Sequence, residues 1–172
     1  GEALRNTGDA VASVRPGIDV MIEREAVGVI GLITPWNFPI AIPAWKLAPA
    51  LAYGNAVVMK PAELTPGCAW ELAKILHEAG CPAGIFNLVM GPGSKVGARI
   101  VEHEDIAAVS FTGSVATGRQ LAVDCAARGK KVQLEMGGKN PMVVVDDADL
   151  EVAVGACLNG AFFSTGQRCT AS

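Results

Sequence analysis

Among the side chains of this sequence, cysteine is the one best suited to covalent chemistry, and Cys169 has the surroundings that favour it. It ends the segment STGQRC (164–169), whose small residues let backbone and substrate approach closely. The neighbouring Arg168 favours the thiolate, which is the reactive form of the side chain. We therefore predict that Cys169 is a catalytic nucleophile.

The sequence around the other cysteines indicates that they pack in the hydrophobic core. Cys68, Cys125 and Cys157 lie inside apolar helical patterns, and Cys81 follows a glycine in a loop, so we predict small buried hydrophobic residues at all of these positions. The total of five is odd and contains no CxxC pair, which supports neither a disulfide framework nor a zinc ribbon. A reducing cytoplasm is the compartment that we expect.

Two further polar residues can work with a thiol. Glu135 follows an apolar run and precedes two glycines, and a glutamate in a partly desolvated cleft can act as general base. The alternative is a structural carboxylate in a salt bridge. Asn37 lies in a turn beside Pro35 and can donate its amide N–H to an oxyanion, where losing a donor typically costs about 10²–10³ in rate. The alternative is an asparagine that only forms the turn.

A nucleotide site is indicated by FTGSVATG (111–118), which is typical of a strand, a turn and a helix start that presents N–H groups to phosphate. The pattern is GSxxxG rather than GxGxxG, so a simple tight turn is the alternative. Lys60 and Glu63 can hydrogen-bond ribose hydroxyls, and a carboxylate there repels a 2′-phosphate. A solvated surface ion pair is the other reading of these two residues.

Several classes of function do not fit. His77 and His103 are both far along the chain from the nucleophile, so a cysteine protease is a poor match and no metal site is expected. Net charge is −3 without a basic patch, which argues against a nucleic-acid partner. Because the chain opens without a signal peptide and its apolar runs are only strand-sized, no membrane partner is expected.

The elements that must position these residues alternate along the chain. An apolar fraction of 51% and a mean hydropathy of +0.36 suit a parallel sheet covered on both faces. Strands separated by helices imply right-handed crossovers, so we predict an α/β fold with a doubly wound parallel, Rossmann-like sheet. The predicted strands are 27–33, 56–60, 86–90, 107–111 and 132–135, and the predicted helices 40–51, 65–79, 93–102 and 114–127.

The polar and glycine-rich segments all follow predicted strands. In open parallel sheets, ligands bind outside the carboxyl ends of the strands. One edge of the sheet should therefore collect an amide, an ammonium group, carboxylates and tight turns. These segments are 34–37, 60–63, 91–93, 112–114 and 135–138.

The two ends of the chain differ from this pattern. Residues 1–17 have a weak helical signal, and 18–23 alternate as a strand that either pairs with another chain or forms a surface arm. A strand is predicted at 141–145 and a helix at 150–163. We expect an arm at 1–26, a nucleotide-binding domain at 27–135, and the start of a second α/β domain at 136–172. A first residue other than Met and a stop in mid-pattern suggest an internal fragment.

Together, five motifs resemble successive signatures of the NAD(P)-dependent aldehyde dehydrogenase superfamily, in family order. They are TPWNFP (34–39), KPAE (60–63), FTGS (111–114), EMGGKNP (135–141) and FSTGQRC (163–169). Met136 stands where leucine is more common in the family, which is a volume-conserving change. Segments 13–17 and 162–169 are most similar to the 2-oxoglutarate semialdehyde (2,5-dioxopentanoate) dehydrogenases, so a carboxylated semialdehyde is the expected substrate.

The resemblance implies roles for individual residues. Cys169 attacks the aldehyde, Asn37 and the Cys169 backbone N–H hold the oxyanion, and Glu135 activates the water that hydrolyses a thioester. NAD is the implied cofactor, with NADP the alternative, and the full-length protein is expected to be a homo-oligomer. The implied cofactor-binding residues are Ile33, Thr34, Pro35, Trp36, Lys60, Glu63, Gly93, Phe111, Thr112, Gly113, Ser114, Met136 and Gly137.

Two other functions remain open. The chain by itself could be a nucleotide-binding module without turnover, because half a catalytic domain cannot shield a thioester from bulk water. Transfer of the acyl group to coenzyme A is disfavoured, since Glu135 is present to activate water.

Overall fold

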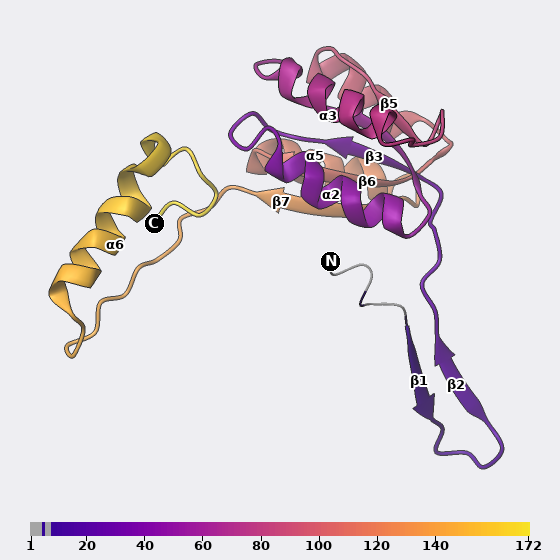
Figure 1. Cartoon of the computed structure of the whole chain (residues 1–172), viewed down its shortest axis with the longest axis horizontal. Helices are drawn as coiled ribbons and strands as arrows, with labels where there is room; N and C mark the ends of the chain where they lie inside the picture. Colours follow the sequence, from indigo (N-terminus) through magenta and orange to yellow (C-terminus); the bar gives the residue numbers. More distant parts are fainter. Residues whose placement is uncertain (1–4, 6–7) are drawn as a thin grey trace.

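A parallel sheet forms the centre of the molecule (Figure 1). The computed structural model describes residue 5 and residues 8–172. Within them the sheet has five strands in the order β5-β4-β3-β6-β7, so the chain starts at the central strand and winds outward to both edges. This confirms the predicted doubly wound fold. The strands are β3 (Val29–Ile33), β4 (Ala56–Lys60), β5 (Phe86–Leu88), β6 (Ile106–Gly113) and β7 (Lys131–Met136).

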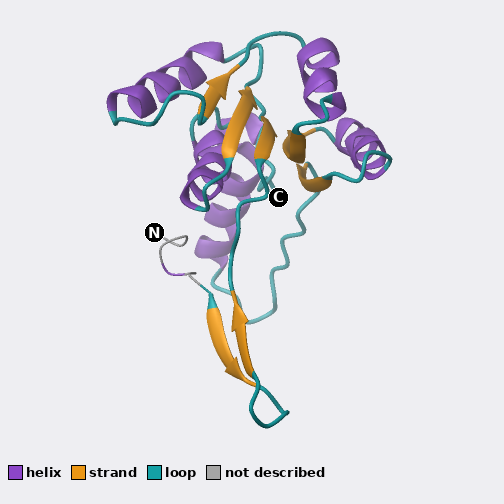
Figure 2. Ribbon diagram, turned by 90° about the vertical axis from the view of Figure 1, so that its right-hand side faces the viewer, coloured by secondary structure: helices purple, strands orange, loops and turns teal. Residues whose placement is uncertain are grey.

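Helices cover both faces of the sheet (Figure 2). On one face α2 (Ala41–Ala52) and α3 (Pro66–Glu78) pack through Leu47 and Ala69 onto Leu32, Val57 and Met59. On the other face, a π-helical turn (Gly93–Gly97) leads into α4 (Ala98–Glu102), which packs with α5 (Val115–Ala126). The second core contains Ile100, Val101, Ile106, Val109, Phe111, Leu121 and Cys125. Each side chain of this size contributes roughly 1.5–3 kcal/mol when fully buried.

The five strands lie close to their predicted positions, because β-branched and apolar residues fill them and glycines or prolines follow them. The predicted N-cap of α3 is at Thr65, with Pro66 in the first turn, although the Thr65 side chain makes no capping hydrogen bond. Ser114 caps α5 by accepting a hydrogen bond from the Thr117 N–H. The helix start at Ser114 therefore lies at the carboxyl end of β6, where the sequence pattern predicted a phosphate-binding turn.

An antiparallel hairpin projects from the sheet and its helices (Figure 2). It consists of β1 (Asp9–Ala12) and β2 (Asp19–Ile22), with Val11 opposite Val20, and every strand residue is exposed. The strand predicted at 18–23 is confirmed. The weak helical signal over 1–17 is wrong at 9–12, because pairing with β2 satisfies that backbone, while residues 1–4 and 6–7 of that prediction lie outside the described residues.

The last part of the chain lies apart from the sheet (Figure 1). The helix predicted at 150–163 is confirmed as α6 (Leu150–Phe162), capped by Asp149, and a 3₁₀ turn (Phe163–Gly166) follows. The strand predicted at 141–145 is wrong: among the described residues no strand lies alongside to share hydrogen bonds, and Val143 is 80% exposed.

The predicted burial of the packing cysteines is correct for Cys125 and only partly correct for Cys68 and Cys81, which are half-buried. For Cys157 the prediction is wrong. This cysteine is exposed, because α6 has no buried residue, although its thiol lies 3.1 Å from the Met142 sulfur. In residues 8–172, no helix is both long enough and apolar enough to cross a membrane.

Candidate active site

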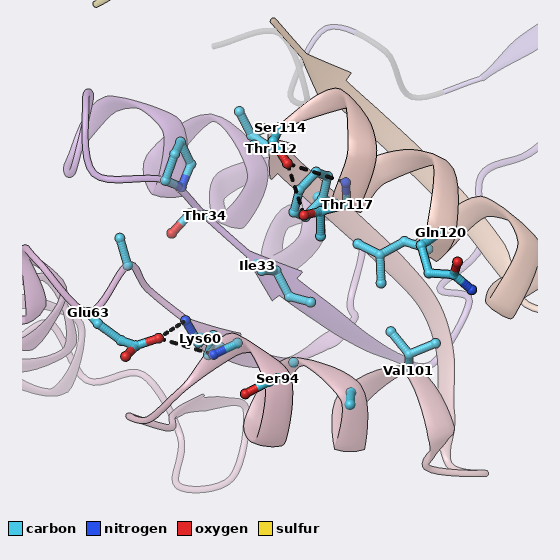
Figure 3. A pocket seen from close by; sticks show the side chains of 18 of the residues that line it. Ile33, Thr34, Lys60, Glu63, Ser94, Val101, Thr112, Ser114, Thr117 and Gln120 are labelled. Carbon is cyan, nitrogen blue, oxygen red and sulfur yellow. Dashed lines mark hydrogen bonds and ion pairs between the residues drawn. The ribbon is translucent and has the colours of Figure 1, made fainter.

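A cleft of about 890 Å³ opens at the carboxyl ends of β3, β4 and β6 (Figure 3). The chain leaves β3 and β6 in opposite directions along the sheet, so this is the switch point at which ligands bind in such folds. The predicted cofactor residues that line the cleft are Ile33, Thr34, Pro35, Trp36, Lys60, Glu63, Gly93, Phe111, Thr112, Gly113 and Ser114.

The turn from β6 into α5 forms one wall of the cleft. The Ser114 hydroxyl accepts from the Thr117 N–H at 3.2 Å and donates to Thr117 Oγ1 at 2.9 Å (Figure 3). The remaining N–H groups of the first helical turn have no partner within the helix, and they carry its positive dipole end. The sequence analysis did not predict a role for Thr117, although its position three residues after the serine cap indicates a residue that can pair with the cap.

Lys60 and Glu63 form the opposite wall (Figure 3). The ammonium group of Lys60 lies 3.7 Å from Glu63 Oε1, and Lys60 is only 5% exposed while the Glu63 side chain is 56% exposed, so only the carboxylate of the pair is solvated. Glu63 Oε1 also accepts from the Gly93 N–H at 3.1 Å. The carboxylate is thereby held at the rim of the cleft with one side toward solvent.

Two hydroxyl groups in the cleft have no hydrogen-bond partner. Thr34 Oγ1 and Thr112 Oγ1 are both buried and unpaired, and buried polar groups normally find partners. Gly113 leaves the backbone of this turn bare, because a Cβ there would lie 2.5 Å from the Phe111 ring. Free donors, a helix start and bare backbone fit a nucleotide with phosphate and ribose groups.

Met136 and Gly137 are the two predicted cofactor residues that do not line this cleft. Met136 packs instead against the α5-side core, where a Cβ at Gly118 would clash with its sulfur. Gly137 lies just beyond the end of β7. Their contact with a cofactor stays a prediction.

A second pocket, of about 570 Å³, lies on the α2 side of the same edge. Cys169 and Glu135 both line it, although they are far apart in sequence. Thr112 lines both this pocket and the cleft, so the two spaces meet at the end of β6. The geometry thus brings a thiol, a carboxylate and the larger cleft to one edge of the sheet.

The loop that carries Cys169 is tied to the sheet edge by amides. Asn37 Nδ2 donates to the Gln167 carbonyl at 3.1 Å, which uses one of its two N–H donors. Asn140 Nδ2 donates to the carbonyls of Cys169 at 2.6 Å and Ala171 at 2.9 Å. Asn140 was quoted only as part of a motif in the sequence, and its role in holding the loop was missed.

Arg168 does not face the thiol as the sequence suggested. Its Nη2 donates to the carbonyls of Asn159 at 2.6 Å and Gly160 at 3.3 Å, and its guanidinium carbon lies 4.9 Å from the centre of the Phe163 ring. The negative dipole end of α6 attracts the cation, although the Asn159 and Gly160 carbonyls also accept from the N–H groups of Phe163 and Ser172. Just before it, Ser164 and Thr165 have left-handed φ values of 52° and 55°, which turn the chain sharply toward the sheet.

Sequence reasoning also missed Lys46, which lines the Cys169 pocket from α2. Its ammonium group donates to Ser110 Oγ at 2.7 Å and to Gln133 Oε1 at 2.8 Å. Burial lowers the pKa of Lys46 to about 8, and the Glu135 carboxylate opposes that shift. The available signal was a single charge in an otherwise apolar helix.

No three His, Cys, Asp or Glu side chains gather closely enough to hold a metal ion in the part of the chain that the structure describes. The side chains gathered at this edge of the sheet include a thiol, two carboxylates, two ammonium groups, amides and hydroxyls.

Comparison with known proteins gives a consistent result. The sequence profile of the aldehyde dehydrogenase family matches residues 1–172. The chain is 53% identical over 172 residues to an alpha-ketoglutaric semialdehyde dehydrogenase of Bacillus subtilis (strain 168), covering 100% of this chain and 35% of that protein. It is 47% identical over 171 residues to a betaine aldehyde dehydrogenase of the same strain, covering 99% of this chain and 35% of that protein.

Among solved structures, the betaine aldehyde dehydrogenase of Staphylococcus aureus in complex with NAD+ superimposes with a TM-score of 0.90. Sequence identity is 42%, and the match covers 99% of this chain and 34% of that one. The chain therefore spans about a third of the length of the relatives that it matches.

Proposed function

Because the chain belongs to the aldehyde dehydrogenase family, we propose that the protein containing it oxidises an aldehyde to a carboxylate with NAD. The observation that carries the proposal is the pocket that Cys169 shares with Glu135, which meets the larger cleft at Thr112. A thiol, a carboxylate and a cofactor cleft are the parts that such an oxidation needs.

The cleft residues supply the cofactor site in this proposal. Lys60 and Glu63 bind the adenosine ribose, and the first turn of α5 after Ser114 holds the pyrophosphate. The fixed carboxylate of Glu63 repels a 2′-phosphate, which favours NAD over NADP. NAD, when bound, supplies the acceptor for the hydride that leaves the aldehyde carbon.

The residues of the second pocket do the covalent chemistry. The Cys169 sulfur adds to the aldehyde carbon, and the oxyanion is stabilised by the Cys169 backbone N–H and the second N–H of Asn37. Oxidation leaves the acyl group on the sulfur as a thioester. Glu135 then takes a proton from water, the water oxygen adds to the acyl carbon, and the thiolate leaves.

We propose a carboxylated semialdehyde as the substrate. The support is the higher identity to the alpha-ketoglutaric semialdehyde dehydrogenase, 53%, than to the betaine aldehyde dehydrogenase, 47%. A panel of 2-oxoglutarate semialdehyde, succinate semialdehyde, betaine aldehyde and propionaldehyde, each with NAD and with NADP, tests substrate and cofactor together. Faster turnover of betaine aldehyde than of the semialdehydes would overturn the proposed substrate. Faster turnover with NADP than with NAD would overturn the proposed cofactor.

The mechanism is tested with two variants of the complete protein. Cys169→Ala should abolish aldehyde-dependent NADH formation, because no thiohemiacetal can form. Glu135→Gln should give one burst of NADH per site and then stall, because the thioester is not hydrolysed. Steady-state turnover in Cys169→Ala would refute the assignment of the nucleophile, and undiminished turnover in Glu135→Gln that of the base.

A second candidate is that this stretch by itself binds a nucleotide without turnover. It is favoured by the exposure of Cys169 and by the absence of any buried residue in α6 within the described chain. Calorimetric NAD binding by residues 1–172, without NADH production, is its expected outcome. NADH production by residues 1–172 alone would exclude it.

A further inference from the structure

Four polar side chains form a connected hydrogen-bond chain along the wall of the Cys169 pocket. Lys46 Nζ donates to Gln133 Oε1 at 2.8 Å, and Ser110 Oγ donates to the same oxygen at 2.5 Å. Gln133 Nε2 then donates to Glu135 Oε1 at 3.0 Å. Gln133 is therefore the link between the cation on α2 and the carboxylate at the end of β7.

The secondary structure explains why these residues meet. Gln133 and Glu135 are two positions apart on β7, so their side chains project from the same face of the sheet. Ser110 on β6 is the registered partner of Gln133, and α2 places Lys46 over that pair. Three elements thus converge on the Gln133 amide.

The direction of the Gln133 amide follows from its partners. An ammonium group has only donors, so the atom of Gln133 that faces Lys46 must be the carbonyl oxygen. The NH₂ group is then turned toward Glu135, where it can only donate. Gln133 and Glu135 are both exposed in this chain, so packing does not hold them and the hydrogen bonds determine their orientation.

We propose that Gln133 is a positioning residue that holds the Glu135 carboxylate in the orientation and the ionised form that a general base needs. An N–H donor favours the charged form of a carboxylate and restricts its rotation. Oε1 of Glu135 accepts this bond, and in this proposal Oε2 takes the proton from water. This inference rests on the proposed function, because it assigns a support to the base of that reaction.

Two substitutions of Gln133 test the N–H group that it donates to Glu135 separately from its contacts with Lys46 and Ser110. Gln133→Met removes the amide but leaves the 2.7 Å bond between Lys46 and Ser110. Gln133→Glu keeps the shape and both acceptor contacts, but it replaces the donor to Glu135 with a like charge. Lys131→Met is the matched control, since Lys131 lies on the same strand and face but lines a different pocket from Glu135.

Acylation and hydrolysis are measured separately in the complete protein. With the best aldehyde of the panel and NAD, the first-turnover burst reports thioester formation and the steady-state rate reports hydrolysis. With p-nitrophenyl acetate and no cofactor, the thiolate displaces p-nitrophenolate in a burst, and water then releases acetate. Both substrates leave an acyl group on the Cys169 sulfur that only the hydrolysis step removes.

We expect the burst amplitude to stay near one per site in every Gln133 variant. The steady-state rate should fall about tenfold in Gln133→Met, as for loss of a hydrogen bond to a charged group, and further in Gln133→Glu. Lys131→Met should match the wild type. The acidic limb of the steady-state pH profile should move to higher pH in Gln133→Met, which a merely structural role would not cause. The other titratable groups facing Glu135 are Lys46 from α2 and Cys169 from the last loop, and both are retained in all variants.

The failures can be told apart. A wild-type protein that oxidises no aldehyde and shows no Cys169-dependent burst would refute the proposed function and this inference with it. A normal wild type with unchanged steady-state rates and pH limbs in both Gln133 variants would refute only the positioning role. A reduced burst in Gln133→Met and Gln133→Glu alike would also overturn it, because the effect would then lie on the nucleophile.

Discussion

At the scale of single residues, the wall of the Cys169 pocket is made of polar side chains that hydrogen-bond to one another. Lys46 shows this most clearly, because it is half-buried and yet donates to two partners across the sheet face. Its charge compensates the nearby Glu135 carboxylate, while burial works against that charge. The balance between these two effects predicts a pH dependence.

Lys46 has a folded-state pKa of about 8, below its ordinary value of 10.5. Between these values the unfolded chain binds more protons at this position, so the free energy of unfolding should rise with pH from about 8 to 10.5. Lys46→Met lacks this contribution. Denaturant titrations at several pH values should therefore show wild type gaining stability relative to Lys46→Met across that interval. A difference that stays constant with pH would contradict the prediction.

At the scale of elements, the cleft depends on how closely α4 approaches the sheet. Gly31 in the middle of β3 makes that approach possible, because a Cβ there would clash with the Ile100 methyl group on α4. The packing of α4 against β3 in turn keeps Ala98 and Val101 in the floor of the cleft.

Gly31→Ala should lower the free energy of unfolding by about 1–3 kcal/mol, the usual cost of overpacking a core. Gly67→Ala is the matched control. Gly67 lies in α3 with no atom within 4 Å of its Cβ position, so alanine should stabilise the helix by roughly 0.5–1 kcal/mol. Denaturant unfolding measures both. If the free energy of unfolding changed in the same direction in both variants, the proposed close packing of Ile100 against Gly31 would be excluded.

At the scale of the whole molecule, the β1–β2 hairpin and the last part of the chain, which carries α6, lie outside the sheet and its helices. The β1–β2 hairpin exposes apolar side chains, with Val11 and Val20 paired across the strands. A two-stranded hairpin is marginal by itself in water. We therefore expect the hairpin to pair with another copy of the complete protein.

In the oligomer that we expect for the complete protein, Val20→Glu should give a smaller species, because a charge would enter the paired surface. Val14→Glu makes the same chemical change at the fully exposed tip of the hairpin and should leave the oligomer intact. Light scattering after size-exclusion chromatography measures the mass of each. An unchanged mass for Val20→Glu would refute the prediction.

The amino-acid sequence alone determined the alternation of strands and helices between residues 27 and 136, because apolar periodicity and glycine or proline breaks are local signals. It also placed most of the candidate site, since parallel strands bring the segments after their carboxyl ends to one edge. Thr34, Lys60, Glu63 and Ser114 were found in this way, and all of them line the cleft.

Tertiary structure alone decided which polar groups pair. The Lys46–Gln133–Glu135 link joins α2 to β7, and no local pattern predicts a contact across 87 residues of chain. Arg168 lies toward the end of α6, where it donates to the Asn159 carbonyl and where the helix dipole favours a cation. Likewise 141–145 stayed unpaired and 9–12 became a strand, because a strand exists only where a neighbour completes its hydrogen bonds.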